Sequence, residues 1–170
     1  EEALRPIEFY SSSLPILNAI CKKIHPSLSH IIFEGVSDIN GEKQGVFTTK
    51  RLKHLLVTFK DDEIIKVSRG NPTESGVYYE YIINGSNIKE IRKFKTSGTT
   101  MILNLIFKET NDIIKHGAIE RYDSDGNLVS YSPYKNDKID GVHKRFYTNG
   151  NTKSESKYAN GVKIGETIRY

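Results

Sequence analysis

Three arginines, Arg121, Arg145 and Arg169, recur at a constant interval of 24 residues. A guanidinium group binds a carboxylate or a phosphate through two parallel hydrogen bonds, so a line of such groups is suited to an anionic partner. His143 lies two residues before Arg145 and shares its side of an extended strand, because side chains alternate along a strand. These four residues are the candidate binding residues. The simpler alternative is a solvated face on which the arginines pair with nearby Asp and Glu.

No catalytic or metal-binding motif accompanies them. The five histidines lie outside HExxH and CxxC-type settings, and the chain has neither a GxSxG elbow nor a GxxxxGK[ST] phosphate loop. Cys21 and His25 are one helical turn apart, but the apolar neighbours of Cys21 favour a buried thiol over a reactive thiolate. The sequence therefore predicts a protein that is not an enzyme and that uses no cofactor and no metal.

The composition indicates a folded domain with a polar surface. The 170 residues are 36% apolar and 27% charged, which is enough for one domain or a short repeat array with its own core. The net charge of +4 is mild, and no run of Lys and Arg reaches five residues. Acidic proteins or anionic lipids remain open as partners, whereas nucleic acid is disfavoured.

One helix is predicted, over residues 14–24. Ser13 and Pro15 are typical of a helix start, and His25-Pro26 ends the segment. The apolar residues in between fall on a single stripe. The stripe consists of Leu17, Ile20, Cys21 and Ile24.

The rest of the chain predicts strands separated by tight turns. Asn-Gly and Asp-Gly pairs, which close hairpins with the required twist, recur between segments of six to ten residues. The expected fold is mainly β: a meandering, antiparallel, single-layer sheet of repeated hairpins. The predicted strands are 29–36, 44–49, 53–60, 63–69, 77–83, 87–96, 99–108, 113–122, 127–134, 142–147, 152–158 and 165–170.

The last third of the chain is periodic. Gly117, Gly141 and Gly165 begin successive 24-residue units, and aromatic residues follow at a spacing of twelve. A fixed period indicates one small unit used repeatedly, here one hairpin. The aromatic residues are Tyr122, Tyr134, Phe146, Tyr158 and Tyr170.

The repeated segments GVHKRFYTNGNTKSESKYANGVKIG (141–165) and HGAIERYDSDGNLVSYSPYKNDKIDG (116–141) resemble MORN repeats, and more closely the bacterial variant of that repeat. The resemblance implies a curved sheet of hairpins that contacts proteins or lipids, in a family often labelled antitoxin or immunity proteins. Two departures predict a bend or a break in the sheet: Asp137 where the family has a turn glycine, and the irregular stretch 99–114.

The sequence divides into two segments and predicts which face of the sheet is packed. Residues 1–28 form an N-terminal helical cap segment, and 29–170 form the repeat domain, clearest over 117–170. The ring column of Tyr122, Phe146 and Tyr170 is expected on the packed face, with the arginines on the other. The helix is expected to cover an open end or face of the sheet.

The favoured function is a non-catalytic binding protein of immunity or antitoxin type, which neutralises a cognate toxic effector by direct binding. The alternative is an exported surface or virulence protein that uses the array for protein or lipid contact. The expected partner is a protein, with acidic lipid and a homodimer left open. The location also stays open: a bacterial periplasm or the exterior, after removal of a signal peptide, or the cytoplasm.

Overall fold

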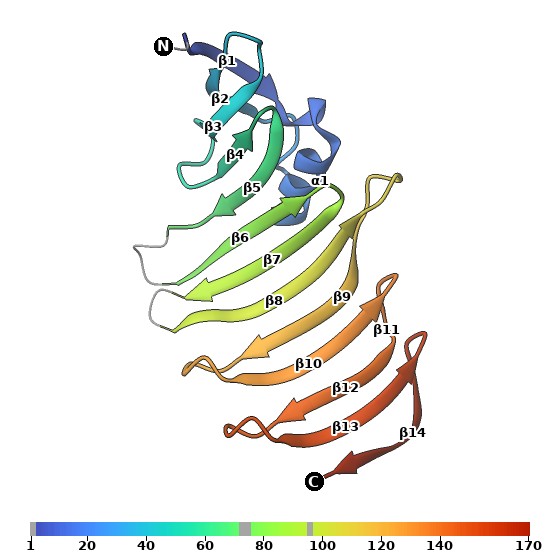
Figure 1. The fold of residues 1–170 in the computed structure, drawn as a ribbon. Coiled ribbons are helices and arrows are strands. Elements are labelled where there is room, and N and C mark those ends of the chain that lie inside the picture. The colour runs from blue at the N-terminus through green and yellow to red at the C-terminus, as the bar shows by residue number, and fades with distance from the viewer. Residues whose placement is uncertain (1–2, 72–75, 95–96) are drawn as a thin grey trace.

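The computed structural model describes residues 3–71, 76–94 and 97–170. Within these ranges, fourteen antiparallel strands form one open sheet, in which each strand pairs with the next along the chain except at β11, which pairs with β10 alone (Figure 1). The strands are β1 (Arg5–Tyr10), β2 (Ile32–Ser37), β3 (Lys43–Thr48), β4 (Leu56–Lys60), β5 (Glu63–Arg69), β6 (Val77–Asn84), β7 (Asn87–Phe94), β8 (Gly98–Phe107), β9 (Ile113–Tyr122), β10 (Leu128–Lys135), β11 (Lys138–Ile139), β12 (Gly141–Phe146), β13 (Thr152–Ala159) and β14 (Val162–Arg169).

The predicted fold class is confirmed: the protein is a β meander with one short helix, α1 (Pro15–Ile24), preceded by a 3-10 turn, η1 (Ser11–Ser13). Each predicted strand is present with small shifts at its ends. Residues 95–96 of the predicted strand 87–96 lie outside the described residues. The stretch 99–114 does not break the sheet, since β8 pairs with both β7 and β9.

Two strands were not predicted. β1 lies within the segment that the sequence assigns to a helical cap, and it pairs with β2 along its whole length. Its alternation is short, and Pro6 obscures it, because proline is tolerated only at the edge of a sheet. β11 has only two residues, too few for any periodic signal.

The hydrophobic core lies between α1 and one face of the N-terminal strands, called here the helix face. Leu17, Ile20 and Cys21 of α1 are fully buried, as are Phe33 of β2 and Phe47 of β3. Four phenylalanine rings, at centroid distances of 5.0 to 5.7 Å, fill this core beside the helix. Burial of this kind stabilises by about 1.5–3 kcal/mol per large side chain.

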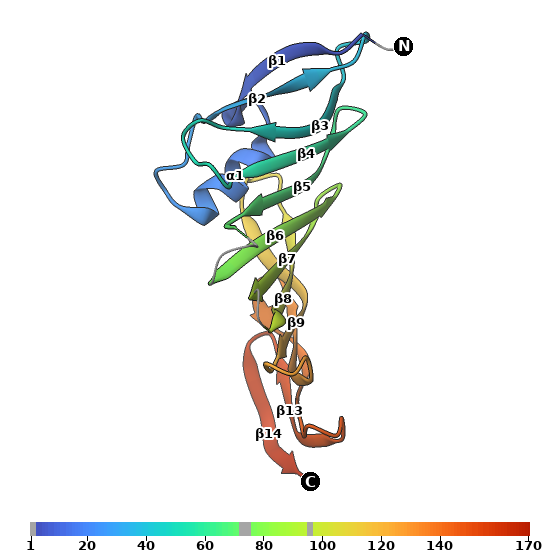
Figure 2. The same cartoon turned by 90° about the vertical axis from the view of Figure 1, so that its left-hand side faces the viewer.

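The C-terminal strands form a single layer. Figure 2 shows α1 against the upper strands only, while β13 and β14 continue below with no second layer beside them. The buried core residues farthest along the chain are Leu103 and Leu105 of β8 and Ile119 of β9, and half-buried Tyr134 of β10 packs against this core. From β10 onwards each hairpin is therefore held mainly by its neighbours, as in other repeat arrays.

The register explains the 24-residue period. Gly117 on β9 pairs with Tyr134 on β10, and Gly141 on β12 pairs with Tyr158 on β13. Both glycines have positive φ, 114° and 120°, which a residue with a side chain rarely adopts. Each unit thus places an aromatic residue directly across from a glycine on the neighbouring strand.

Asp137 serves as a turn residue without the expected glycine. Asn136 and Asp137 have φ of 49° and 71°, the left-handed conformations that a two-residue hairpin turn requires. The backbone N–H of Asp137 donates to the carbonyl of Lys115 at 2.8 Å, and the Lys115 N–H donates to Asp137 Oδ1 at 3.2 Å. These two bonds tie the turn to β9, and the sheet continues past it through β12.

The expectation that the ring column packs the core is wrong. Tyr122 lies on the face opposite α1, where its hydroxyl donates to the carboxylate of Glu120. Phe146 is half-buried, and Tyr170 is 62% exposed. The core instead occupies the face that carries the arginines, because Ile119 and Arg121 alternate with Glu120 along β9. The helix does cover a face of the sheet, as expected.

Gly35 makes room for the Phe47 ring. A Cβ at Gly35 would lie 2.5 Å from that ring, so we expect Gly35→Ala to lower the free energy of unfolding by about 1–3 kcal/mol through overpacking. In a Phe47→Leu background the same change should cost clearly less. Urea denaturation of the two single variants and the double variant measures the coupling, and additive effects would contradict it. Val46→Thr, at a 54% exposed position of β3, is the control and should change stability little.

Cys21 reports on the docking of α1. Burial raises the pKa of its thiol to about 12, and the side chain has no exposed surface. We expect no labelling by a thiol-reactive disulfide reagent in the native protein at pH 8, and full labelling in urea. Rapid labelling without denaturant would show that α1 leaves the sheet.

Candidate functional site

The three repeat arginines lie in one line across the sheet. Arg121 and Arg145 both pair with Ser130 of β10, and Arg145 and Arg169 both pair with Ser154 of β13. Paired residues project from the same face, so the three guanidinium groups alternate with two serine hydroxyls on the helix face. We call these five residues the arginine row.

The same line of paired residues continues beyond the arginine row towards the N-terminus. Met101 pairs with Arg121 and with Arg92, and Tyr79 pairs with Arg92 and with Arg69. Arg69 and Arg92 were missed from the sequence because they precede Arg121 by 52 and 29 residues, which are not multiples of 24. Their alternation with Tyr79 and Met101 becomes visible only when the paired strands are aligned.

A second row of paired residues lies two positions along each strand from the arginines. Its side chains change from mostly buried and apolar to polar at β10. On the N-terminal side it contains buried Val67, Tyr81, Leu103 and Ile119, with the buried carboxylate of Glu90 between Tyr81 and Leu103. On the C-terminal side it contains Ser132, His143, Ser156 and Thr167, which we call the hydroxyl row. Hydrogen bonds of 2.7 Å join Ser132 to His143 and Ser156 to Thr167. The core thus gives way to a polar surface on the same face.

The arginines of the two halves are engaged differently. Arg69 donates to the carbonyl of Ile24 at the end of α1 and lies 4.5 Å from the Tyr79 ring centroid. Arg92 pairs at 3.2 Å with Glu90, which also contacts Lys23 of α1. These contacts hold α1 on the sheet.

By contrast, Arg121, Arg145 and Arg169 are exposed. None of the ion pairs within residues 3–71, 76–94 and 97–170 includes them. The alternative of a face neutralised by its own Asp and Glu therefore does not describe these three side chains. Three uncompensated cations next to hydroxyl groups form a surface suited to anionic groups.

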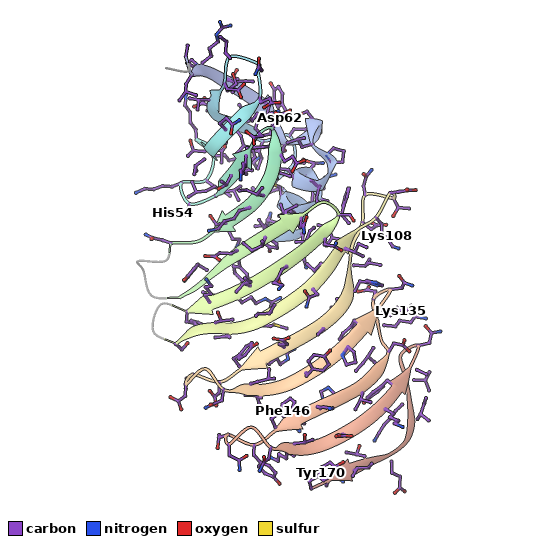
Figure 3. All side chains as sticks on the ribbon, viewed as in Figure 1. His54, Asp62, Lys108, Lys135, Phe146 and Tyr170 are labelled. Carbon is purple, nitrogen blue, oxygen red and sulfur yellow. The ribbon has the colours of Figure 1, made fainter. Side chains whose placement is uncertain are left out.

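The face is hollowed between β12 and β14. A cavity of about 370 Å³ lies over β13 and is lined by cationic and hydroxyl side chains from three strands. Figure 3 places Phe146 and Tyr170 at this end of the sheet, far from α1, and shows Lys108 and Lys135 at hairpin turns along one side of the sheet. The lining includes Arg145, Lys153, Ser154, Ser156, Tyr158 and Arg169.

His143 contributes a hydrogen-bonding group to this cavity rather than a charge at neutral pH. Burial lowers its pKa, the neighbouring Arg145 guanidinium lowers it further, and a backbone hydrogen bond with Tyr131 acts in the opposite direction. All four residues predicted from the sequence thus lie on one face. The serine and threonine hydroxyls were not predicted: Ser130 and Ser154 alternate with the arginines, and the others lie beside them in the hydroxyl row.

Within the described ranges, no three His, Cys, Asp or Glu side chains are grouped so that they could hold a metal ion. The helix found in those ranges is also too short and too polar to cross a membrane.

Fold and site together define an open β-sheet protein built of hairpin repeats, with a helix over one half of a face and a basic, hydroxyl-rich surface on the other half. Comparison with models of known families, with curated proteins and with solved structures finds no match to this chain.

The pKa of His143 tests the electrostatics of the site. We expect an NMR titration to give a value below the ordinary 6.5, and Arg145→Gln to raise it only part of the way, since burial remains. Between the lowered pKa of folded His143 and the ordinary value of 6.5, the unfolded chain binds more protons at this residue than the native protein. The contribution of neutral His143 to stability is therefore present above pH 6.5 and is lost as the pH falls through the folded pKa. Titration of His143 at or above 6.5 would contradict the assignment.

Proposed function

We propose that this protein is a non-catalytic binding module that neutralises a cognate toxic effector by covering an acidic part of its surface. The observation that carries the proposal is the uncovered half of the helix face, where three exposed guanidinium groups lie at equivalent positions, with no ion pair to any residue of the described ranges. Charge matching of this kind speeds encounter and rejects wrong partners, which suits an inhibitor that must bind one target.

The size of the surface supports a protein partner. The five strands β9, β10, β12, β13 and β14 span a face of roughly 600 Å², from strand spacing and rise per residue. A stable interface buries about 800 Å² on each partner, so the polar face and the adjoining hairpin turns would together suffice. A hydrogen-bonded sheet is also preformed, which limits the entropy lost on binding.

The immunity or antitoxin role rests on the resemblance of residues 117–170 to the bacterial MORN variant, together with this surface. Inhibition by coverage requires a matched shape and charge and no chemistry in the inhibitor itself. Periodic hairpins provide such a surface, because repetition brings like side chains into line.

Co-expression tests the role. A protein retained by this chain from an extract of its source organism is expected to arrest bacterial growth when expressed alone, and growth should return when this chain is co-expressed. The triple variant Arg121→Gln, Arg145→Gln, Arg169→Gln should lose most of the protection while keeping its stability, since all three side chains are exposed.

The matched control is Lys89→Gln, Lys144→Gln, Lys157→Gln, which removes the same charge from the opposite face. It should protect as well as the wild type. A retained protein that is harmless on its own, or equal protection by both triple variants, would refute the proposal.

A further inference from the structure

The arginine row has a fixed pitch that limits what can bind along it. Arg121, Arg145 and Arg169 lie on alternate strands of the sheet path, with β10 and β13 between them. Strands lie about 4.8 Å apart, so neighbouring arginines are about 10 Å apart at the backbone. Each pair flanks one serine hydroxyl, that of Ser130 or that of Ser154.

Each flanked serine marks a place where an anionic group can be held from two sides. Over Ser154 the place is a cavity, lined by Arg145 and Arg169 together with Lys153 and Tyr158. Over Ser130, the pair Arg121 and Arg145 occupies the equivalent positions one repeat earlier. Arg145 is common to both places, and the two centres are again about 10 Å apart.

We propose, as a deepening of the proposed function on which it rests, that the arginine row binds an acidic, extended polypeptide segment of the partner, with one carboxylate over Ser130 and the next over Ser154. The segment runs across the strands. In a polyproline II conformation, three residues advance about 9.3 Å, so acidic residues at every third position match the pitch and share one side of the segment. A fully extended chain advances about 10 Å over the same three residues but turns every third side chain to the opposite side, so polyproline II is the conformation that fits.

The protein's own helix shows how this face engages a polypeptide. Arg69, on the same line of residues, donates to the Ile24 carbonyl at the C-terminal end of α1. Next to Arg69, the side chains of Val67 and Tyr81 are buried. The hydroxyl row replaces them in the C-terminal half, so the ligand of that half is polar and anionic rather than an apolar helix. The uncompensated cations supply the charge complementarity.

Two capped, fluorescein-labelled peptides of identical composition test the pitch. One repeats Glu-Pro-Pro four times, and the other has four glutamates in succession followed by eight prolines. Fluorescence anisotropy with the whole protein, at low and at physiological salt, should show at least tenfold tighter binding of the spaced peptide. Equal affinities, or tighter binding of the block peptide, would overturn the proposal, because bulk charge alone would then explain the binding.

Variants of single residues distinguish binding by the arginine row from non-specific electrostatic attraction. Arg145→Gln is expected to weaken binding of the spaced peptide more than Arg121→Gln or Arg169→Gln, because Arg145 flanks both serines. The control triple Lys89→Gln, Lys144→Gln, Lys157→Gln should change the dissociation constant less than twofold. An equal loss from the arginine and lysine triples would overturn the proposal, as would a twelve-nucleotide oligothymidylate that binds the row more tightly than the spaced peptide.

The outcome is distinguishable from that of the co-expression experiment. If protection from an effector depends on the arginines but neither peptide binds, the proposed function stands and this inference fails. If the spaced peptide binds as expected but no effector is neutralised, the ligand class stands and the neutralising role fails.

Discussion

The backbone hydrogen-bond register between consecutive strands is the constraint on which the structure depends. Because side chains alternate along each strand, a slip of one residue would turn a whole strand's side chains to the other face. Glycines at positive φ and turns such as Asn136-Asp137 hold that register in the C-terminal repeats. The same register that buries Ile119 next to Leu103 sets Arg121 beside Ser130. The core and the proposed binding surface are therefore two stretches of one continuous set of rows.

The two halves of the sheet are stabilised in different ways. The N-terminal half acquires a second layer from α1, which is anchored by apolar packing and by the contacts of Arg69 and Glu90. Glu90 is buried, and its charge is matched by Arg92 and Lys23, since a lone buried carboxylate would be strongly disfavoured. The C-terminal half has no such layer and gains its stability from strand pairing and from side chains lying across neighbouring strands. Its polar face is therefore left uncovered by the helix.

Much of this architecture could be predicted from the sequence. Helix boundaries followed from Pro15 and His25-Pro26, and most strands from alternation between Asn-Gly or Asp-Gly turns. The common face of the arginines followed from a period that the register preserves. The choice of packed face could not be predicted, because both faces carry large apolar or aromatic residues, and the decision depends on where α1 docks. Arg69 and Arg92 were missed for a related reason: hairpins of unequal length conceal an alignment that exists only between paired strands.

The 24-residue unit also makes the molecule extensible. Each hairpin contacts mainly the one before and the one after, so a duplication or loss of 72 nucleotides in the gene would leave every remaining pairing intact. One such event adds or removes a single guanidinium and about 10 Å of reach. Gain or loss of whole units would therefore change the length of the arginine row in fixed steps, without new mutations in the existing strands.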